Sequence, residues 1–228
     1  GQFCTNPGLI LAMSCPALET FLSALQKAIA LTETGAMLHT GIEKAYLEKT
    51  REALAQKEVE LLVASGGDKA EVDSPRAYIA RISAQDFLSN PLVHEEIFGP
   101  WSLVVVCSDV QEMIACRRAV AGQLTTTLMA NDGDLMEYPG LVDVALSHAG
   151  RVVFNGVPTG VEVAAAMVHG GPHPACTDSR FTAVGPMAIQ RWTRPLCWQN
   201  APPFVLPDAL KDENPLGIWR MVDGEFRV

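Results

Sequence analysis

The sequence lacks the features that bind nucleic acids or span membranes. It contains no run of five or more basic residues, and its 228 residues carry a formal net charge of −9. Nucleic acids and anionic membrane surfaces attract clustered lysine and arginine, which this chain does not offer. Its apolar stretches, such as residues 103–107, fall far short of the roughly 20 residues that cross a bilayer. We therefore expect neither a nucleic acid nor a membrane as a partner.

Cysteine is present, but without the spacing of a disulfide or redox framework. No two of the six cysteines form a Cys-x-x-Cys pair, and the beginning of the chain lacks the basic region of a signal peptide. Disulfide frameworks belong mainly to small secreted domains, whereas a chain that is 48% hydrophobic can bury a sizeable core. We expect free thiols and a cytoplasmic protein.

The sequence also lacks a glycine-rich phosphate-binding loop of the Gly-x-Gly-x-x-Gly or Walker type. By its own residues, the chain carries no dinucleotide-binding element. A metal site is not expected either. His169 and His173 stand four apart, a spacing that brings two ligands together on a helix, but Gly170-Gly171-Pro172 between them prevents a helix. We expect this turn to line a pocket instead.

The chain does contain an alternation of strands and helices. The pattern Thr40-Gly41-Ile42-Glu43 resembles a capping box, and Ser108 and Gln111 are the expected caps of a later helix. The alternation indicates an α/β fold with a mostly parallel sheet flanked by helices. Hydrophobic periodicity predicts strands at 9–13, 59–64, 76–82, 103–106, 125–129 and 152–154, and helices at 16–29, 40–56, 108–121, 140–148 and 186–192.

Regular periodicity fails from 156 to 180, where glycine, proline and histidine dominate. A long irregular loop inside a compact domain is usually functional. Residues 194–199 are predicted to form an exposed edge strand, which would need a partner to satisfy its main chain.

Three places carry residues suited to chemistry. Cys4 stands in a small-residue turn directly before an apolar strand, where main-chain N–H groups can gather around a nucleophilic thiolate. Glu96 can accept both hydroxyls of a ribose, and Phe98 can pack against the same nucleotide. Asn155 follows a buried strand and can anchor the irregular loop through its amide. Each place also has an ordinary structural interpretation: a buried cysteine, a solvated loop and a turn anchor.

Taken in order, these places resemble the catalytic half of an aldehyde dehydrogenase. The ending Asn214-Pro215-Leu216-Gly217-Ile218-Trp219-Arg220 is similar to that of the 2-oxoglutarate semialdehyde (2,5-dioxovalerate) dehydrogenase branch. The resemblance covers nearly the whole chain but only about half of such an enzyme. Its motifs are Gly1-Gln2-Phe3-Cys4-Thr5, Glu96-Ile97-Phe98-Gly99-Pro100, and Asn155 with the loop to His169-Gly170-Gly171.

The resemblance implies an oxidation of a small semialdehyde that depends on NADP or NAD. Cys4 would attack the aldehyde to form a thiohemiacetal, and its main-chain N–H would help to hold the oxyanion. Loss of hydride to the nicotinamide would leave a thioester, which water hydrolyses. Glu96 would bind the nicotinamide ribose and Phe98 would pack beside it. The aldehyde entrance would be lined by Asn155, His169 and Gly170.

The resemblance also implies how the protein is organised. We expect a catalytic domain over 1–190, and an oligomerisation strand with a C-terminal tail over 191–228, in a homodimer or homotetramer. The general-base glutamate, the oxyanion-stabilising asparagine and the cofactor-binding domain would lie upstream of residue 1. This chain alone is therefore expected to be inactive.

Two alternatives stay open. The chain could be a non-enzymatic half that assembles with a separate cofactor-domain chain. It could also be a free-standing thiol hydrolase that uses Cys4, which would need a histidine within hydrogen-bond reach.

Overall fold

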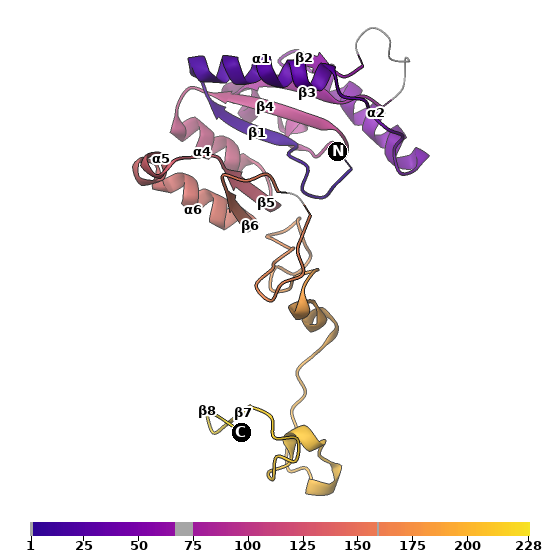
Figure 1. Ribbon diagram of the computed structural model, residues 1–228, viewed down its shortest axis with the longest axis vertical. Helices are drawn as coiled ribbons and strands as arrows, with labels where there is room; N and C mark the ends of the chain where they lie inside the picture. The colour runs from indigo at the N-terminus through magenta and orange to yellow at the C-terminus, as the bar shows by residue number, and fades with distance from the viewer. Residues whose placement is uncertain (1, 67–74, 159) are drawn as a thin grey trace. The chain divides into compact units, whose positions relative to one another are not determined.

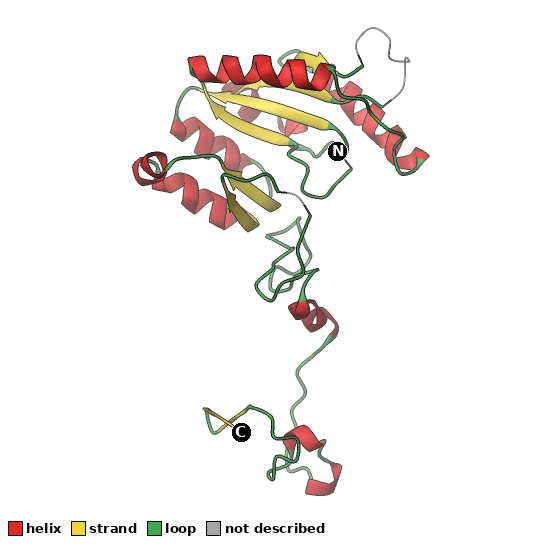
Figure 2. Cartoon of the chain, in the orientation of Figure 1, coloured by secondary structure: helices red, strands yellow, loops and turns green. Residues whose placement is uncertain are grey.

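The computed structural model describes residues 2–66, 75–158 and 160–228. The chain divides into two compact units, Gly1–Arg191 and Trp192–Val228. Figure 1 follows the chain through both units, and Figure 2 distinguishes their helices, strands and loops. The first unit holds all of the candidate site residues.

The larger sheet of the first unit has four strands in the order β1-β4-β3-β2. Strand β4 (Trp101–Cys107) pairs in parallel with β1 (Leu9–Met13) on one side and β3 (Tyr78–Ser83) on the other. Strand β2 (Glu60–Ala64) pairs antiparallel to β3 at the edge. Because β4 is buried on both faces, its sequence is a continuous apolar run.

Helices cover both faces of this sheet (Figure 1). On one face, Leu18 and Leu22 pack in a cluster with Val104. On the other, Tyr46 and Phe87 join a cluster that contains Val105. Neighbouring residues of β4 thus belong to clusters on opposite faces of the sheet, because successive side chains of a strand point to opposite faces. The helices are α1 (Pro16–Ala30) on the first face, and α2 (Thr40–Leu54), α3 (Ala84–Ser89) and α4 (Val110–Ala119) on the second.

A second sheet of two strands follows in the same unit. Strands β5 (Gln123–Leu128) and β6 (Ala149–Phe154) pair in parallel. Their connection contains α5 (Asp132–Glu137) and α6 (Pro139–His148). The predicted α/β fold with mostly parallel strands is therefore confirmed, although the parallel strands are divided between two sheets.

Two helices begin differently from the sequence prediction. The N-cap of α2 is His39 and not Thr40. The His39 ring accepts hydrogen bonds from the main-chain N–H groups of Gly41 and Ile42, at 3.1 and 3.3 Å. Helix α4 is capped by Asp109 and not by Ser108 or Gln111. The Asp109 carboxylate accepts from a main-chain N–H of the first turn at 2.8 Å.

The second unit contains little regular structure. Strands β7 (Arg220–Val222) and β8 (Glu225–Arg227) pair antiparallel around Asp223-Gly224, whose φ values of 53° and 85° suit a two-residue hairpin turn. The 3₁₀ turns are η4 (Pro203–Val205) and η5 (Asp208–Leu210). The short helix predicted at 186–192 is the 3₁₀ helix η3 (Pro186–Trp192), which lies at the end of the first unit except for Trp192.

Residues 194–199 form no strand within the chain. Because the strand predicted there would pair with another subunit, it stays a prediction. None of the helices in the described part of the chain is long and apolar enough to cross a membrane.

Candidate active site

Cys4 lies in a tight turn that leads into β1. The main-chain N–H of Asn6 donates to the carbonyl of Phe3 at 3.0 Å, which places Cys4 and Thr5 at the centre of the turn. The thiol of Cys4 is free and exposed, whereas Thr5 beside it is buried. The turn therefore presents the thiol outward on a fixed stretch of main chain.

Side chains of the same turn bind two distant segments of the unit. The Asn6 amide donates to the carbonyl of Gly99 at 3.2 Å, just before β4. The Thr5 hydroxyl donates to the carbonyl of Pro158 at 3.0 Å, in the segment that follows β6. The position of Cys4 thus depends on contacts with residues about 95 and 150 positions further along the chain.

The loop before β4 presents Glu96 and Phe98 to solvent. Ile97, between them, packs against the main core cluster, while its two neighbours are exposed. Lys49 of α2 holds this arrangement, since its Nζ donates to the main-chain carbonyl of Glu96 at 3.0 Å and pairs with the Glu95 carboxylate at 3.4 Å. Lys49 therefore fixes the main chain of Glu96, while the exposed Glu96 carboxylate faces solvent.

Tyr46 of α2 fixes the end of the same loop. Its ring lies so close to Gly99 that a Cβ at that position would overlap it. Its hydroxyl lies 2.5 Å from the carbonyl oxygen of Arg76 and 3.2 Å from that of Pro100. Burial raises the pKa of Tyr46 well above its usual range, so the hydroxyl remains a donor. Because Asn6 binds Gly99, the Cys4 turn and the Glu96 loop are held together.

Asn155 lies directly after β6 in the left-handed region, with φ of 49°. Its amide oxygen accepts from the N–H of Ala130 at 2.9 Å, and its amide nitrogen donates to the carbonyl of Ala130 at 2.7 Å. Both polar atoms of the side chain thus tie the end of β6 to the connection after β5. The amide is an anchor, but for that connection and not for the irregular loop.

His169 and Gly170 lie at the other end of β6. The carbonyl oxygen of Gly170 approaches Gly150 so closely that a Cβ there would overlap it, and the His169 N–H donates to the Thr182 hydroxyl at 2.9 Å. Gly150 and Asn155 are five positions apart, which corresponds to about 16 Å of extended strand. The structure therefore brings Cys4 near the Glu96 loop, but it keeps His169 and Gly170 apart from Asn155.

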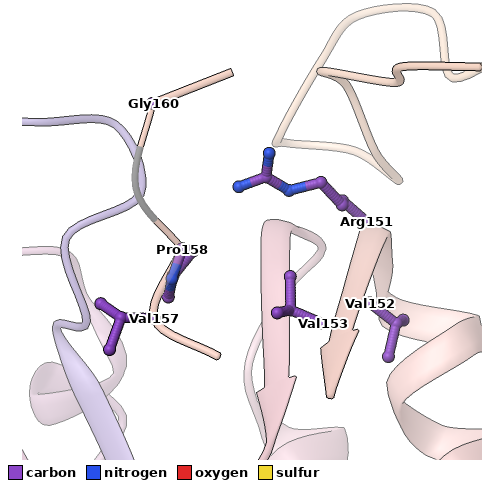
Figure 3. Close-up of a pocket in the computed structure, with 6 residues that line it drawn as sticks. All are labelled: Arg151, Val152, Val153, Val157, Pro158 and Gly160. Carbon is purple, nitrogen blue, oxygen red and sulfur yellow. The ribbon is translucent and has the colours of Figure 1, made fainter. Parts of the chain in front are cut away.

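A cavity of about 300 Å³ lies between β6 and the segment that follows it. In Figure 3 the Arg151 guanidinium extends from β6 toward the segment that carries Gly160. Because Thr5 binds Pro158, one wall of the cavity is the same segment that braces the Cys4 turn. The lining residues are Arg151, Val152, Val153, Val157, Pro158 and Gly160.

Arg151 was not among the site residues predicted from the sequence. The available signal was one charged residue inside the otherwise apolar strand β6.

Across residues 2–66, 75–158 and 160–228, no group of three or more side chains that could hold a metal ion comes together.

Among the curated proteins that this chain resembles are two semialdehyde dehydrogenases. No family model matches the chain. The alpha-ketoglutaric semialdehyde dehydrogenase of Acinetobacter baylyi is 42% identical over 225 residues, which cover 98% of this chain and 43% of that protein. Alpha-ketoglutaric semialdehyde dehydrogenase 2 of Azospirillum brasilense is also 42% identical, over 229 residues that cover 99% of this chain and 43% of that protein.

Over nearly its whole length the chain is therefore similar to part of an aldehyde dehydrogenase. It spans about 43% of the length of these two relatives. The resemblance expected from the Cys4, Glu96 and Asn155 motifs is therefore confirmed at the level of the family.

Solved structures, aldehyde dehydrogenases among them, share the fold. Proline utilization A of Bdellovibrio bacteriovorus matches with a TM-score of 0.68 at 18% identity, covering 86% of this chain and 20% of that one. A betaine aldehyde dehydrogenase of Staphylococcus aureus in complex with NAD+ matches with a TM-score of 0.64 at 18% identity, covering 84% of this chain and 39% of that one. The chain therefore shares its fold with these proteins.

Proposed function

We propose that the chain is the catalytic portion of an NAD(P)-dependent semialdehyde dehydrogenase, which oxidises 2-oxoglutarate semialdehyde to 2-oxoglutarate. The names of the two relatives support the substrate class. The observation that carries the proposal is the exposed, free thiol of Cys4, on a turn that Asn6 and Thr5 tie to the Glu96 loop and to Pro158.

Cys4 acts as the nucleophile. Its thiolate attacks the aldehyde carbon to form a thiohemiacetal, and oxidation converts this to a thioester that water hydrolyses to the acid. The turn is closed by the N–H of Asn6, so the N–H of Cys4 itself is not used in closing it. We assign this N–H to the developing oxyanion.

Glu96 and Phe98 are the residues that would hold the nicotinamide cofactor. Both side chains are exposed on a loop whose main chain Lys49 and Tyr46 fix. The residues present fit the cofactor, because the carboxylate can accept hydrogen bonds from two ribose hydroxyls and the aromatic ring can pack beside them. When bound, the nicotinamide supplies the hydride acceptor. The solved relatives include enzymes in complex with NAD+, and NADP is our proposal for this chain.

We place the general base, the oxyanion-stabilising asparagine and the cofactor-binding domain in the part of the protein that this chain does not span. The chain would then be inactive alone. The second unit leaves large apolar side chains such as Trp192, Trp198 and Trp219 exposed, which fits a homodimer or homotetramer that covers them. All six cysteines are free, which fits a cytoplasmic protein.

The test is formation of reduced nicotinamide by the whole protein purified from its native cells. We expect turnover of 2-oxoglutarate semialdehyde with NADP+ or NAD+, from a polypeptide more than twice as long as this chain. A native polypeptide of this length without activity would instead favour a half that assembles with a separate cofactor-domain chain.

The thiol hydrolase alternative finds no support in the contacts of Cys4. Two histidine rings are engaged elsewhere: His94 Nε2 lies 2.7 Å from the carbonyl of Phe87, and His148 Nδ1 lies 3.0 Å from that of Val144. Among the described residues, no histidine forms a hydrogen bond with the Cys4 thiol.

A further inference from the structure

Three polar atoms without partners lie on one face of the β5–β6 sheet. Among the described residues, no hydrogen-bond partner reaches the buried Nε of Arg151 or the buried hydroxyls of Thr125 and Thr127. Thr125 pairs with Arg151 across the sheet, and Thr127 pairs with Val153. Paired residues share a face of a sheet, as do residues two apart on one strand. All three polar atoms therefore belong to one face. Arg151 and Val153 of this face line the cavity together with Val152 of the opposite face, and Thr125 and Thr127 lie beside Arg151 without lining the cavity.

This face offers donors. A guanidinium has five N–H donors and no acceptor, and each threonine hydroxyl can donate once. Within the described residues, the guanidinium finds only the sulfur of Met167, a weak acceptor 3.8 Å from Nη1. Buried donors without acceptors are costly. A carboxylate matches the fork of a guanidinium and accepts from hydroxyls as well.

Two other arginines of the first unit already have partners. Arg180 binds the Asp178 carboxylate through two nitrogens, at 2.6 and 2.9 Å, and its side chain is exposed. Arg117 is buried and donates to the carbonyls of Val120 and His148, at 3.3 and 2.8 Å. By contrast, Arg151 lines a cavity, and its Nε has no hydrogen-bond partner among the described residues.

The cavity adjoins the segment that braces the nucleophile, since its lining residue Pro158 accepts the hydrogen bond of Thr5. Figure 3 shows Pro158 and Gly160 on one side of the cavity and Arg151 on the other. We infer that Arg151, with Thr125 and Thr127, binds the carboxylate of a semialdehyde whose carbonyl carbon reacts at Cys4. This inference rests on the function proposed above, and it assigns the substrate class to ω-semialdehydes that carry a carboxylate.

The experiment compares charged and neutral aldehydes in the whole protein. In Arg151→Gln, kcat/KM for succinate semialdehyde and 2-oxoglutarate semialdehyde falls roughly 10- to 100-fold, as expected for the loss of a charge-assisted hydrogen bond. The value for pentanal, which has no carboxylate, changes by less than about twofold. Arg151→Lys retains the charge and restores part of the loss, and Thr127→Val gives a smaller loss of the same kind.

Protection of Cys4 supplies a second readout that needs no turnover. Iodoacetamide alkylates Cys4, and bound glutarate, a dicarboxylate without an aldehyde, is expected to slow that alkylation. Protection is lost in Arg151→Gln and kept in the matched control Arg180→Gln, because Arg180 is already paired with Asp178.

The outcomes separate this inference from the proposed function. Equal losses for charged and neutral aldehydes in Arg151→Gln, together with a lower melting temperature, would assign Arg151 to packing against the rest of the protein and overturn the inference alone. An unchanged ratio of kcat/KM between charged and neutral aldehydes in Arg151→Gln would also overturn the inference alone. Failure of the unsubstituted protein to oxidise any aldehyde would overturn the proposed function and the inference together.

Discussion

The hydroxyl of Thr5 donates to the main-chain carbonyl of Pro158 at 3.0 Å, across 153 positions of sequence. Thr5 is buried although Cys4 beside it is exposed. This bond is the link between the turn that carries the nucleophile and the segment that walls the cavity beside Arg151.

Replacing Thr5 tests that link. Thr5→Val keeps the shape of the side chain but removes the donor, which leaves the Pro158 carbonyl without this bond. We expect a loss of about 0.5–1.5 kcal/mol in the free energy of unfolding, measured by urea denaturation, and slower aldehyde turnover. Thr20→Val is the matched control, because Thr20 is exposed and bonds only within α1. Equal effects of the two substitutions would contradict the account.

Gly150 tests the position of the His169–Gly170 segment. A Cβ at Gly150 would overlap the carbonyl oxygen of Gly170, so Gly150→Ala must push that main chain away. We expect a loss of about 1–3 kcal/mol in stability, measured by denaturant unfolding. Gly35→Ala serves as the control, since nothing lies within 4 Å of its added methyl. A neutral Gly150→Ala would mean that the two segments do not touch.

Glu96 tests the cofactor assignment. Because the Glu96 carboxylate is exposed while its carbonyl is held by Lys49, Glu96→Gln should leave the loop in place and weaken only the ribose contact. We expect the Kd for the nicotinamide cofactor, measured by fluorescence titration, to rise roughly tenfold, with the rate of Cys4 alkylation unchanged. Slower alkylation with an unchanged Kd would refute the ribose role.

The buried thiol of Cys107 is expected to make the fold less stable at alkaline pH. Burial, reinforced by the neighbouring Cys116 thiol, raises the pKa of Cys107 from 9.0 to about 12. The pKa of Cys107 is higher in the folded state than in the unfolded state. The stability that comes from burying the neutral Cys107 thiol is therefore fully present below pH 9 and is lost as the pH rises toward 12. Thermal melts of Cys107→Ala should show a smaller alkaline loss than melts of Cys15→Ala, a control at an exposed thiol. Parallel curves for the two variants would exclude the effect.

The long elements were predictable from sequence because each has a periodicity of its own. The alternation of apolar residues marks α1, and the continuous apolar run marks β4 between its two parallel neighbours. Helices α3 and α5 are six residues each, shorter than two turns, so no period could reveal them. The cap at His39 was missed because histidine is an unusual N-cap.

The site was predictable only through its motifs. Cys4 and Glu96 stand in recognisable local sequences, but nothing in the sequence indicates that Asn6 joins their loops through Gly99. Arg151 was missed because its proposed role depends on the strand register that places Thr125 opposite it. The register between distant strands is a tertiary property.

The most direct test of the central claim is the rate of aldehyde oxidation by the whole protein carrying Cys4→Ser. If Cys4 forms the thiohemiacetal, Cys4→Ser should lower kcat by about 10³-fold or more, while Cys15→Ser and Cys197→Ser, at two other exposed thiols, keep the original rate. An unchanged kcat in Cys4→Ser would show that the nucleophile is another group and would contradict the account.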